Sequence, residues 1–358
     1  MAVTREEVLK ALETVVDPAS GQNVIAAGMI GGLVLKDRNV GFALEVAPSR
    51  GREAEPLRRA CESAVAALPG VASVSAVLTA HQETAPARAA AAQPAAGIAG
   101  VDAIIAVASG KGGVGKSTVA VNLAIGLAKL GLRAGLLDAD IYGPSVPRLL
   151  GITHKPEQGP GGKLKPIEKF GLKTMSIGYL VDVETPMIWR GPMVQSALTQ
   201  MMNDVLWAPL DVLVVDMPPG TGDAQLTMAQ RVPLRGAVIV STPQDLALID
   251  ARKAIAMFEK TKVPILGLVE NMSVFVCPHC GAESHIFGQG GARRMSQSLG
   301  MAFLGEIPLV GSIRELSDAG TPVVAQAAAE SKAYLDIARA VAAQLRTALR
   351  AAPRIVLE

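Results

Sequence analysis

A glycine-rich segment in the first third of the chain has the residue types of a phosphate-binding loop. Residues 110–117 read Gly-Lys-Gly-Gly-Val-Gly-Lys-Ser and fit the pattern G-x-x-x-x-G-K-[ST]. Glycines at this spacing let the backbone curl so that its N–H groups surround phosphate oxygens. Lys116 would add a positive charge beside the β- and γ-phosphates, and the Ser117 hydroxyl would be a ligand of Mg²⁺. The segment therefore predicts a site for ATP with Mg²⁺. The residues expected to contact the nucleotide are Gly110, Lys111, Gly112, Gly113, Val114, Gly115, Lys116, Ser117 and Thr118.

Two acidic segments follow apolar runs that have the pattern of buried strands. Asp138 and Asp140 follow residues 132–137, and Asp216 follows residues 212–215. The carboxyl ends of parallel strands meet at one edge of an open sheet, where ligands bind. We therefore expect these carboxylates to face the phosphates, with Asp216 holding Mg²⁺, usually through water. A helix N-cap or a turn residue is the alternative role for each aspartate.

A second chemical motif is the close pair Cys277 and Cys280, in the order Cys-Pro-His-Cys. This spacing places two thiolates within reach of one metal centre, and thiolates suit Zn²⁺ or an iron–sulfur cluster. A closed zinc site needs four ligands, a set that His279 and His285 could complete. A thioredoxin-like redox pair is a further alternative, although no thioredoxin-type unit surrounds the motif. The Cys pair thus predicts metal chemistry and leaves zinc and iron–sulfur open.

Lys111 extends the phosphate-loop motif to K-G-G-x-G-K-[ST], the deviant Walker A pattern. In this respect the chain resembles a superfamily of cell-division, plasmid-partition, nitrogenase-reductase, arsenite-pump and iron–sulfur assembly ATPases. The resemblance implies a homodimer in which Lys111 reaches the partner's nucleotide and stabilises transition-state charge, as an arginine finger does. It implies that Asp140 orients or activates the attacking water, so that Lys111, Lys116 and Asp140 are the catalytic residues. It also implies that Asn271, at the end of an expected strand over 265–269, contacts the adenine base.

A two-fold dimer would bring two copies of the Cys pair together, and four thiolates are the usual ligands of a [4Fe–4S] cluster. Longer segments resemble the Mrp/ApbC-type iron–sulfur carrier ATPases, in order, across roughly residues 101–330. The matching segments are Lys111–Thr118, Asp138–Ser145, Trp189–Met193, Asp216–Asp223, Glu270–Ser273, Cys277–Cys280 and Phe287–Gly291. The resemblance implies a slow ATPase that holds a cluster between subunits at Cys277 and Cys280. It would meet a cluster-assembly scaffold and transfer the cluster to apo iron–sulfur proteins.

The elements that must position these motifs divide the chain into three parts. Residues 1–80 predict a small α+β domain that resembles the MIP18-like domain. Its expected elements are a helix with a capping box at Thr4 and Glu7, strands at 29–35, 40–46 and 71–78, and a helix at 53–68. Residues 81–100 are mainly Ala, Pro and Gly and predict a flexible linker.

Residues 101–358 alternate strand-like and helix-like stretches, which predicts a doubly wound α/β domain with a mostly parallel sheet, the fold of P-loop NTPases. The strands expected there are 103–108, 132–137, 212–215, 237–240 and 265–269, and the helices include one ending near residue 130 and one at 244–260.

The composition excludes several other classes of protein. The 358-residue chain is half hydrophobic but only 3% aromatic, and its net charge of +2 is not the basic footprint of a nucleic-acid binder. No uncharged apolar run could span a bilayer and no apolar signal segment begins the chain, so we expect a cytoplasmic protein without a membrane partner. Three cysteines are too few for a disulfide scaffold. We expect Cys61, inside a predicted helix, to be a buried structural thiol.

Several roles stay open. A positioning ATPase of the cell-division or partition kind, and an ATPase with a structural zinc site, are the alternatives to a cluster carrier. The Cys pair favours the carrier, because positioning needs no thiolates.

The amphipathic helix expected at 331–350 should pack on the sheet rather than bind a membrane. Arg190 could contact phosphate or the partner subunit, or form a structural salt bridge, and Asp223 ends a segment that resembles switch II. The loop at 47–52 has no cysteine, which argues against metal binding by the N-terminal domain and leaves a docking or interaction role open.

Overall fold

The computed structural model describes residues 3–36, 39–46, 54–80, 97–180 and 191–350. The chain forms two compact units, residues 1–91 and 92–358, each with its own hydrophobic core. The boundaries expected for the linker stay a prediction, because residues 81–96 lie outside the described part. Among the described residues, none of the helices combines the length and the apolar character needed to cross a bilayer.

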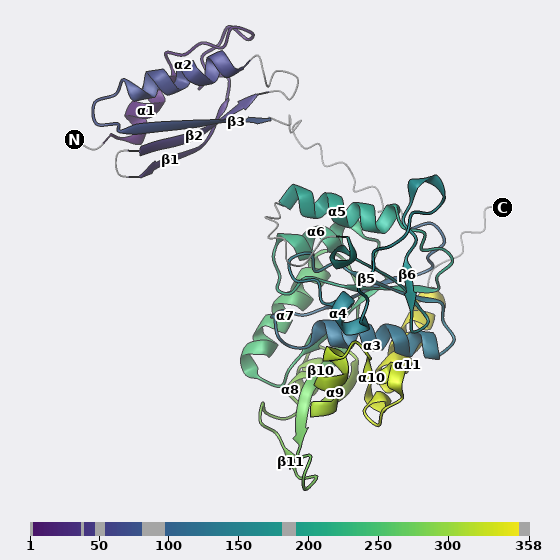
Figure 1. The fold of residues 1–358 in the computed structure, drawn as a ribbon. Coiled ribbons are helices and arrows are strands. Elements are labelled where there is room, and N and C mark those ends of the chain that lie inside the picture. The colour runs from purple at the N-terminus through teal and green to yellow at the C-terminus, as the bar shows by residue number, and fades with distance from the viewer. Residues whose placement is uncertain (1–2, 37–38, 47–53, 81–96, 181–190, 351–358) are drawn as a thin grey trace, which may run out of the picture. The chain divides into compact units, whose positions relative to one another are not determined.

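The N-terminal unit is a three-stranded sheet with two helices (Figure 1). Its elements are α1 (Arg5–Leu12), β1 (Ile30–Lys36), β2 (Asn39–Val46), α2 (Glu55–Ala66) and β3 (Ser73–Ala80). The predicted capping box starts α1: the Thr4 hydroxyl accepts from the Glu7 N–H, and the Glu7 carboxylate accepts from the Thr4 N–H. Strand β2 pairs antiparallel with β1 and parallel with β3, as α2 returns the chain between them. Cys61 of α2 is fully buried in this core, as expected.

The second unit is built on a nine-stranded sheet. Its strands are β4 (Ile104–Ala108), β5 (Ala134–Asp138), β6 (Ile167–Lys169), β7 (Leu172–Ser176), β8 (Val212–Asp216), β9 (Gly236–Ser241), β10 (Ile265–Val276), β11 (Glu283–Ser284) and β12 (Phe303–Leu309). They lie in the order β11-β10-β9-β4-β8-β5-β7-β6, with β12 also paired to β10. All pairs are parallel except β6–β7 and β10–β11. Every residue of β4, β5, β8 and β9 is buried, which explains their continuous apolar runs.

Helices cover this sheet in two layers (Figure 1). They are α3 (Lys116–Lys129), α4 (Val146–Leu150), α5 (Gly191–Asn203), α6 (Asp223–Arg231), α7 (Asp245–Lys260), α8 (Gly291–Ser298), α9 (Gly311–Asp318), α10 (Val323–Gln326) and α11 (Ser331–Arg350). Helices α3, α10 and α11 pack together, while α7 and α8 pack on β9 and β10. The arrangement is the predicted doubly wound fold. The apolar face of α11, with Tyr334, Ile337 and Val341, is buried against α3 and β12, so this helix packs within the unit as expected.

The structure corrects the expected end of one strand. We predicted that the strand beginning at Ile265 ends before Asn271, but β10 continues to Val276 and Asn271 lies inside it. The sequence did not predict this continuation of the strand, because Glu270, Asn271 and Ser273 are polar and polar residues are typical of a loop. They are nevertheless buried and hydrogen-bonded within the sheet region.

Four strands were not predicted at all. Strand β7 contains Lys173 and Thr174, β12 contains Gly305 and Pro308, and β6 and β11 have only three and two residues. None of them is the uniformly apolar run by which β4 was recognised. Beyond the main body, β10 and β11 form a hairpin that extends away from the helices (Figure 1).

Candidate functional site

The loop between β4 and α3 has a backbone that depends on glycine. Gly113 and Gly115 both have φ near +81°, in the left-handed region that glycine adopts without strain. At Gly110 an added Cβ would lie 2.0 Å from the Asp250 carbonyl oxygen, so the loop rests directly on the backbone of α7. Helix α3 begins at Lys116, and its positive end faces the loop. The loop therefore has the shape and polarity of an anion cradle.

A buried ion pair lies beside this cradle. Lys116 Nζ is 2.5 Å from Asp216 Oδ1 and 3.2 Å from Ser117 Oγ, and Asp216 is fully buried at the end of β8. The other carboxylate oxygen of Asp216, Oδ2, is buried without a hydrogen-bond partner among the described residues. An orphaned carboxylate oxygen next to a hydroxyl is a donor set that suits Mg²⁺ or one of its waters. These residues therefore fit a magnesium–nucleotide complex.

Two further aspartates extend the cluster. Asp138 pairs in register with Asp216, and its carboxylate accepts hydrogen bonds from Ser176 Oγ (2.9 Å), the Val146 N–H (3.2 Å) and the Asp140 N–H (3.1 Å). Complete burial, helped by the nearby charge of Asp216, holds the pKa of Asp138 well above its usual range. Asp138 therefore acts as an anchor that orients the backbone of Asp140.

Asp140 is half-buried in the loop that follows β5. Burial raises its pKa and the charge of Lys116 opposes that shift. A carboxylate with a raised pKa is a better proton acceptor, which suits a group that orients or activates water.

The segment after Asp216 is tied to the phosphate loop by a residue that sequence reasoning missed. Gln225 of α6 is buried, and its Nε2 donates to the carbonyl oxygens of Pro218 (2.6 Å) and Ser109 (3.4 Å). The Gly220 N–H also donates to the Ser109 carbonyl oxygen, at 3.1 Å. This loop and the phosphate loop are thus linked directly, as expected of a segment that responds to phosphate. The side chain of Asp223, whose role was left open, is outside the described part.

Asn271 contacts the phosphate loop itself. Its Nδ2 donates to the Val114 carbonyl oxygen at 2.8 Å. It also borders a pocket of about 270 Å³ that Gly115 and Thr118 line from the loop side and α9 from the other side. A pocket that continues from the phosphate cradle is where a nucleotide base would lie. The predicted contact between Asn271 and the base stays a prediction.

The two cysteines lie on the tight turn that joins β10 to β11. The Cys277 N–H donates to the Ala282 carbonyl oxygen and the Gly281 N–H to the Cys277 carbonyl oxygen, both at 2.9 Å. Cys277 is half-buried, Cys280 is exposed, and both are free thiols. Backbone N–H groups, first that of Cys280 and then that of His279, point at the Cys277 sulfur and lower its pKa because they stabilise the thiolate. The turn therefore favours ionisation of a half-buried thiol.

The histidines do not complete a closed site around this pair within one chain. Among the described residues, nowhere do three His, Cys, Asp or Glu side chains gather closely enough to hold a metal ion. His285 instead has its Nδ1 atom 3.3 Å from the Ser273 carbonyl oxygen. Two thiols are half of the four ligands that zinc or a cluster takes from protein.

Of two other predicted residues, Lys111 can be placed and Arg190 cannot. Lys111 is exposed on the phosphate loop, as a residue that reaches another subunit must be, but its action in trans stays a prediction. Arg190 lies outside the described residues.

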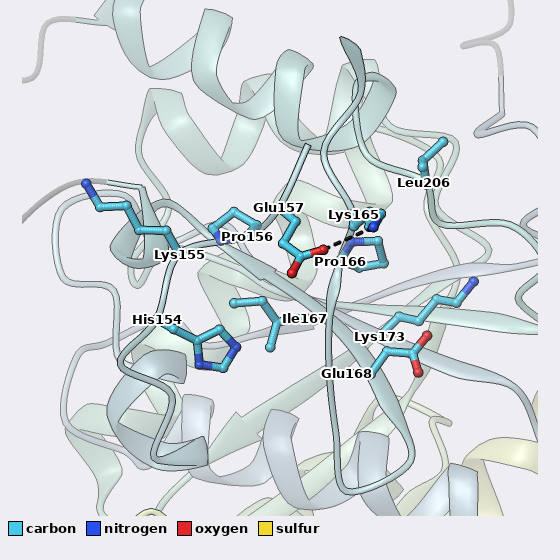
Figure 2. Close-up of a pocket in the computed structure, with 10 residues that line it drawn as sticks. All are labelled: His154, Lys155, Pro156, Glu157, Lys165, Pro166, Ile167, Glu168, Lys173 and Leu206. Carbon is cyan, nitrogen blue, oxygen red and sulfur yellow. Dashed lines mark hydrogen bonds and ion pairs between the residues drawn. The ribbon is translucent and has the colours of Figure 1, made fainter. Parts of the chain in front are cut away.

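A further pocket of the second unit lies away from this site (Figure 2). It has a volume of about 580 Å³ and lies against β6 and β7 at the edge of the sheet. Figure 2 shows its mixed charges, including the ion pair between Lys165 and Glu157, whose Nζ and Oε2 are 3.0 Å apart. None of the phosphate-loop residues, the site aspartates or the cysteines lines this pocket, so it is separate from the site described above.

Comparison with protein families gives two matches. Residues 100–342 match the family described as NUBPL iron-transfer P-loop NTPase, and residues 5–76 match a family described as iron–sulfur cluster assembly protein. Both matches agree with the resemblances found in the motifs.

Individual relatives agree with these matches. The chain is 59% identical over 250 residues to an Arabidopsis thaliana protein named iron–sulfur protein required for NADH dehydrogenase, covering 69% of this chain and 80% of that one. It is 56% identical over 252 residues to the Escherichia coli K12 iron–sulfur cluster carrier protein, covering 70% of this chain and 68% of the relative.

Solved structures support the same fold. A nucleotide-binding protein from Archaeoglobus fulgidus, solved with ADP, superimposes with a TM-score of 0.57 at 41% identity, covering 65% of this chain and 91% of that one. The Pyrococcus furiosus cell-division ATPase MinD superimposes with a TM-score of 0.51 at 20% identity, over 68% of this chain and 99% of that one, which is a likeness of fold alone.

The packing of the phosphate loop predicts different outcomes for two glycine substitutions. A Cβ at Gly110 would meet backbone at 2.0 Å, whereas a Cβ at Gly112 has no neighbour within 4 Å. We expect Gly110→Ala to lower the free energy of unfolding by about 1–3 kcal/mol, as overpacking does. We expect Gly112→Ala to change it by less than about 0.5 kcal/mol. Equilibrium urea denaturation without nucleotide measures both, and equal destabilisation would contradict the loop geometry.

The cysteine turn predicts a pH-dependent reactivity. Because the pKa of Cys277 is lowered, the pH profile of its reaction with iodoacetamide should have a midpoint below the ordinary thiol value of about 8.5. The reaction rate should fall only when the pH drops through that lower midpoint. Burial raises the pKa of Cys61 to about 11, so that thiol should stay unlabelled in the folded protein. Mass spectrometry of each cysteine peptide against pH measures this. In urea the Cys277 midpoint should return to the ordinary value; an unchanged midpoint would mean that the turn does not activate the thiol.

Proposed function

The chain belongs to the family of NUBPL iron-transfer P-loop NTPases, and on that premise we propose that it is an ATP-hydrolysing iron–sulfur cluster carrier. In this proposal two chains bind a [4Fe–4S] cluster between them and transfer it to apo iron–sulfur proteins after loading from a cluster-assembly scaffold. The expected cytoplasmic location, without nucleic-acid or membrane partners, belongs to the same proposal.

The observation that carries the proposal is the incomplete ligand set of the cysteine turn. Cys277 and Cys280 offer two thiols at the surface, and no third side-chain ligand lies near them among the described residues. A two-fold axis beside the turn would supply the missing pair and give four thiolates. A cargo held by exposed ligands on two separable chains can be released, whereas a buried site within one chain would retain it.

A homodimer also fits the surface near the phosphate loop. Tyr142, Leu246 and Ile249 are large apolar side chains with exposed fractions of 62%, 68% and 51%. Tyr142 follows Asp140 by two residues, and Ile249 directly precedes Asp250, on whose backbone the phosphate loop rests. Apolar side chains of this size around a charged site are typical of an interface. A second copy covering them would bring its own Lys111 toward the nucleotide.

In hydrolysis each residue of the site would have a distinct task. The loop N–H groups and Lys116 hold the β- and γ-phosphates, and Asp216 releases Lys116 from their ion pair as the phosphates approach. Mg²⁺, held by Ser117 and Asp216, would neutralise charge on the phosphate oxygens. Asp140, positioned by Asp138, orients the attacking water, and the partner's Lys111 stabilises the charge of the transition state. The base would occupy the pocket beside Asn271.

Two alternative functions have less support. The likeness to the cell-division ATPase is a likeness of fold alone, and positioning on a membrane would gain nothing from α11, whose apolar face is buried. A structural zinc site would need further ligands beyond the Cys pair in each chain.

Anaerobic reconstitution with iron and sulfide tests the carrier function. We expect about four irons and four sulfides per dimer, with visible absorption near 400 nm. The double variant Cys277→Ser, Cys280→Ser should lose both, while Cys61→Ser should load like the parent protein because its thiol is buried in the other unit. Colourless protein that instead takes up one zinc per chain would overturn the cluster proposal and leave the ATPase proposal intact.

Mixing two inactive variants tests whether Lys111 acts across the dimer. Lys111→Ala and Asp140→Ala should each have little ATPase activity as homodimers. In a mixed dimer, the site with an intact Asp140 receives Lys111 from the other chain, so an equal mixture should recover about a quarter of parental activity. Phosphate release after subunit exchange is the measurement. No recovery in mixtures shown to exchange subunits would mean that Lys111 acts within its own chain or is dispensable.

A further inference from the structure

A short stretch of β10 contacts the phosphate loop on one side. Asn271 Nδ2 donates to the Val114 carbonyl oxygen at 2.8 Å. The packing there is tight: a Cβ added to Gly115 would lie 2.3 Å from Asn271 Nδ2 and 3.7 Å from Met272 Cε. The Asn271 and Met272 side chains therefore lie directly against the loop at Gly115, and Asn271 is also joined to it by a hydrogen bond.

The same stretch holds the cysteine hairpin, residues 277–290, on the other side. The carboxylate of Glu270 is fully buried and accepts hydrogen bonds from the N–H groups of Gly290 (3.1 Å) and Ala292 (2.6 Å). These two groups lie where the hairpin returns and α8 begins. The Ser273 carbonyl oxygen lies 3.3 Å from Nδ1 of His285, which directly follows β11 on the returning part of the hairpin. Glu270 and Ser273 thus fix the hairpin at two points.

Between these contacts the strand is irregular. Met272 has φ of 57°, a left-handed conformation that is costly for a residue with a side chain, and the pairing with β12 shifts register between Asn271 and Phe275. Backbone strain of this kind is held in place only by surrounding contacts and is common at functional sites. The contacts on its two sides belong to the two reactive segments, the phosphate loop and the cysteine hairpin.

We propose that Glu270–Ser273 couples nucleotide binding at the phosphate loop to the conformation of the cysteine turn, with Glu270 as the positioning residue. Nucleotide that shifts the Val114 carbonyl group moves Asn271, and the rigid attachments of Glu270 and Ser273 carry that shift to Cys277, four residues beyond Ser273. The coupling rests on the proposed nucleotide site and does not require a cluster, so it can be measured on metal-free protein.

The test measures the iodoacetamide reaction of Cys277 with and without Mg-ADP. In the parent protein we expect saturating nucleotide to change the rate constant at least about fivefold, the lower end of typical coupling between sites. Glu270→Gln keeps the size of the side chain but turns an amide N–H₂ toward one of the two N–H donors. We expect it to reduce the change to less than about twofold, with ADP affinity within about threefold of the parent by calorimetry.

Glu306→Gln is the matched control. Glu306 is the register partner of Glu270 on β12 and also contacts α8, through Arg293 (3.6 Å), but its side chain is half exposed. It should keep the full nucleotide effect. If Glu270→Gln does not fold, His285→Ala removes the other attachment from the surface and should at least halve the effect.

Binding of ADP without any change at Cys277 in the parent protein would overturn this inference alone. An undiminished effect in Glu270→Gln, or an equal loss in Glu306→Gln, would overturn the assigned role of Glu270. No binding of Mg-ADP at all would overturn the nucleotide site and the coupling together.

Discussion

The buried ion pair between Lys116 and Asp216 is the interaction on which the nucleotide site depends. A charge enclosed without a partner costs several kcal/mol, so the first residue of α3 and the last residue of β8 must meet. The parallel pairing of β4 with β8 makes that possible, because it aligns their carboxyl ends. Asp138, in register with Asp216, adds a second carboxyl group that one lysine cannot fully compensate. The pKa of Asp138 is raised as a result, and three hydrogen bonds are donated to its carboxyl group. One of these bonds comes from the Asp140 N–H and fixes the loop that carries Asp140.

Strand β10 joins the two chemical regions of the second unit. In an open α/β sheet, strands usually end where the ligand begins. Here β10 runs past the phosphate loop, shifts its register with β12 between Asn271 and Phe275, and continues into the hairpin that carries the cysteines. Buried polar side chains inside such a strand need partners, and Glu270 and Asn271 find them in the hairpin and the phosphate loop. The requirement to satisfy these groups is therefore what links the two regions.

Sequence patterns could predict the parts of this protein that depend on local residue types. Glycine spacing marked the phosphate loop, apolar runs marked the fully buried strands, and the C-x-x-C spacing marked the thiol pair. Features that depend on distant partners were missed. In the sequence Gln225 is an ordinary helix residue, and only the structure shows its hydrogen bonds to the carbonyl oxygens of Ser109 and Pro218. In the sequence Glu270 resembles a loop residue, and only the structure shows that its carboxylate accepts a hydrogen bond from the Gly290 N–H. Strand β12 was hidden because its glycine and proline obscure an apolar pattern that only pairing with β10 makes clear.

The proposed sharing of one cluster between the cysteine turns of two chains has a consequence for how loading would respond to protein abundance. A site assembled from two chains forms in proportion to the square of the chain concentration wherever free monomers predominate. Dilution alone would then unload the protein, with no change in the affinity of any single thiol. The amount of bound cluster would therefore change more steeply than in proportion to the expression level. A partner that sequesters one chain would reduce it in the same way.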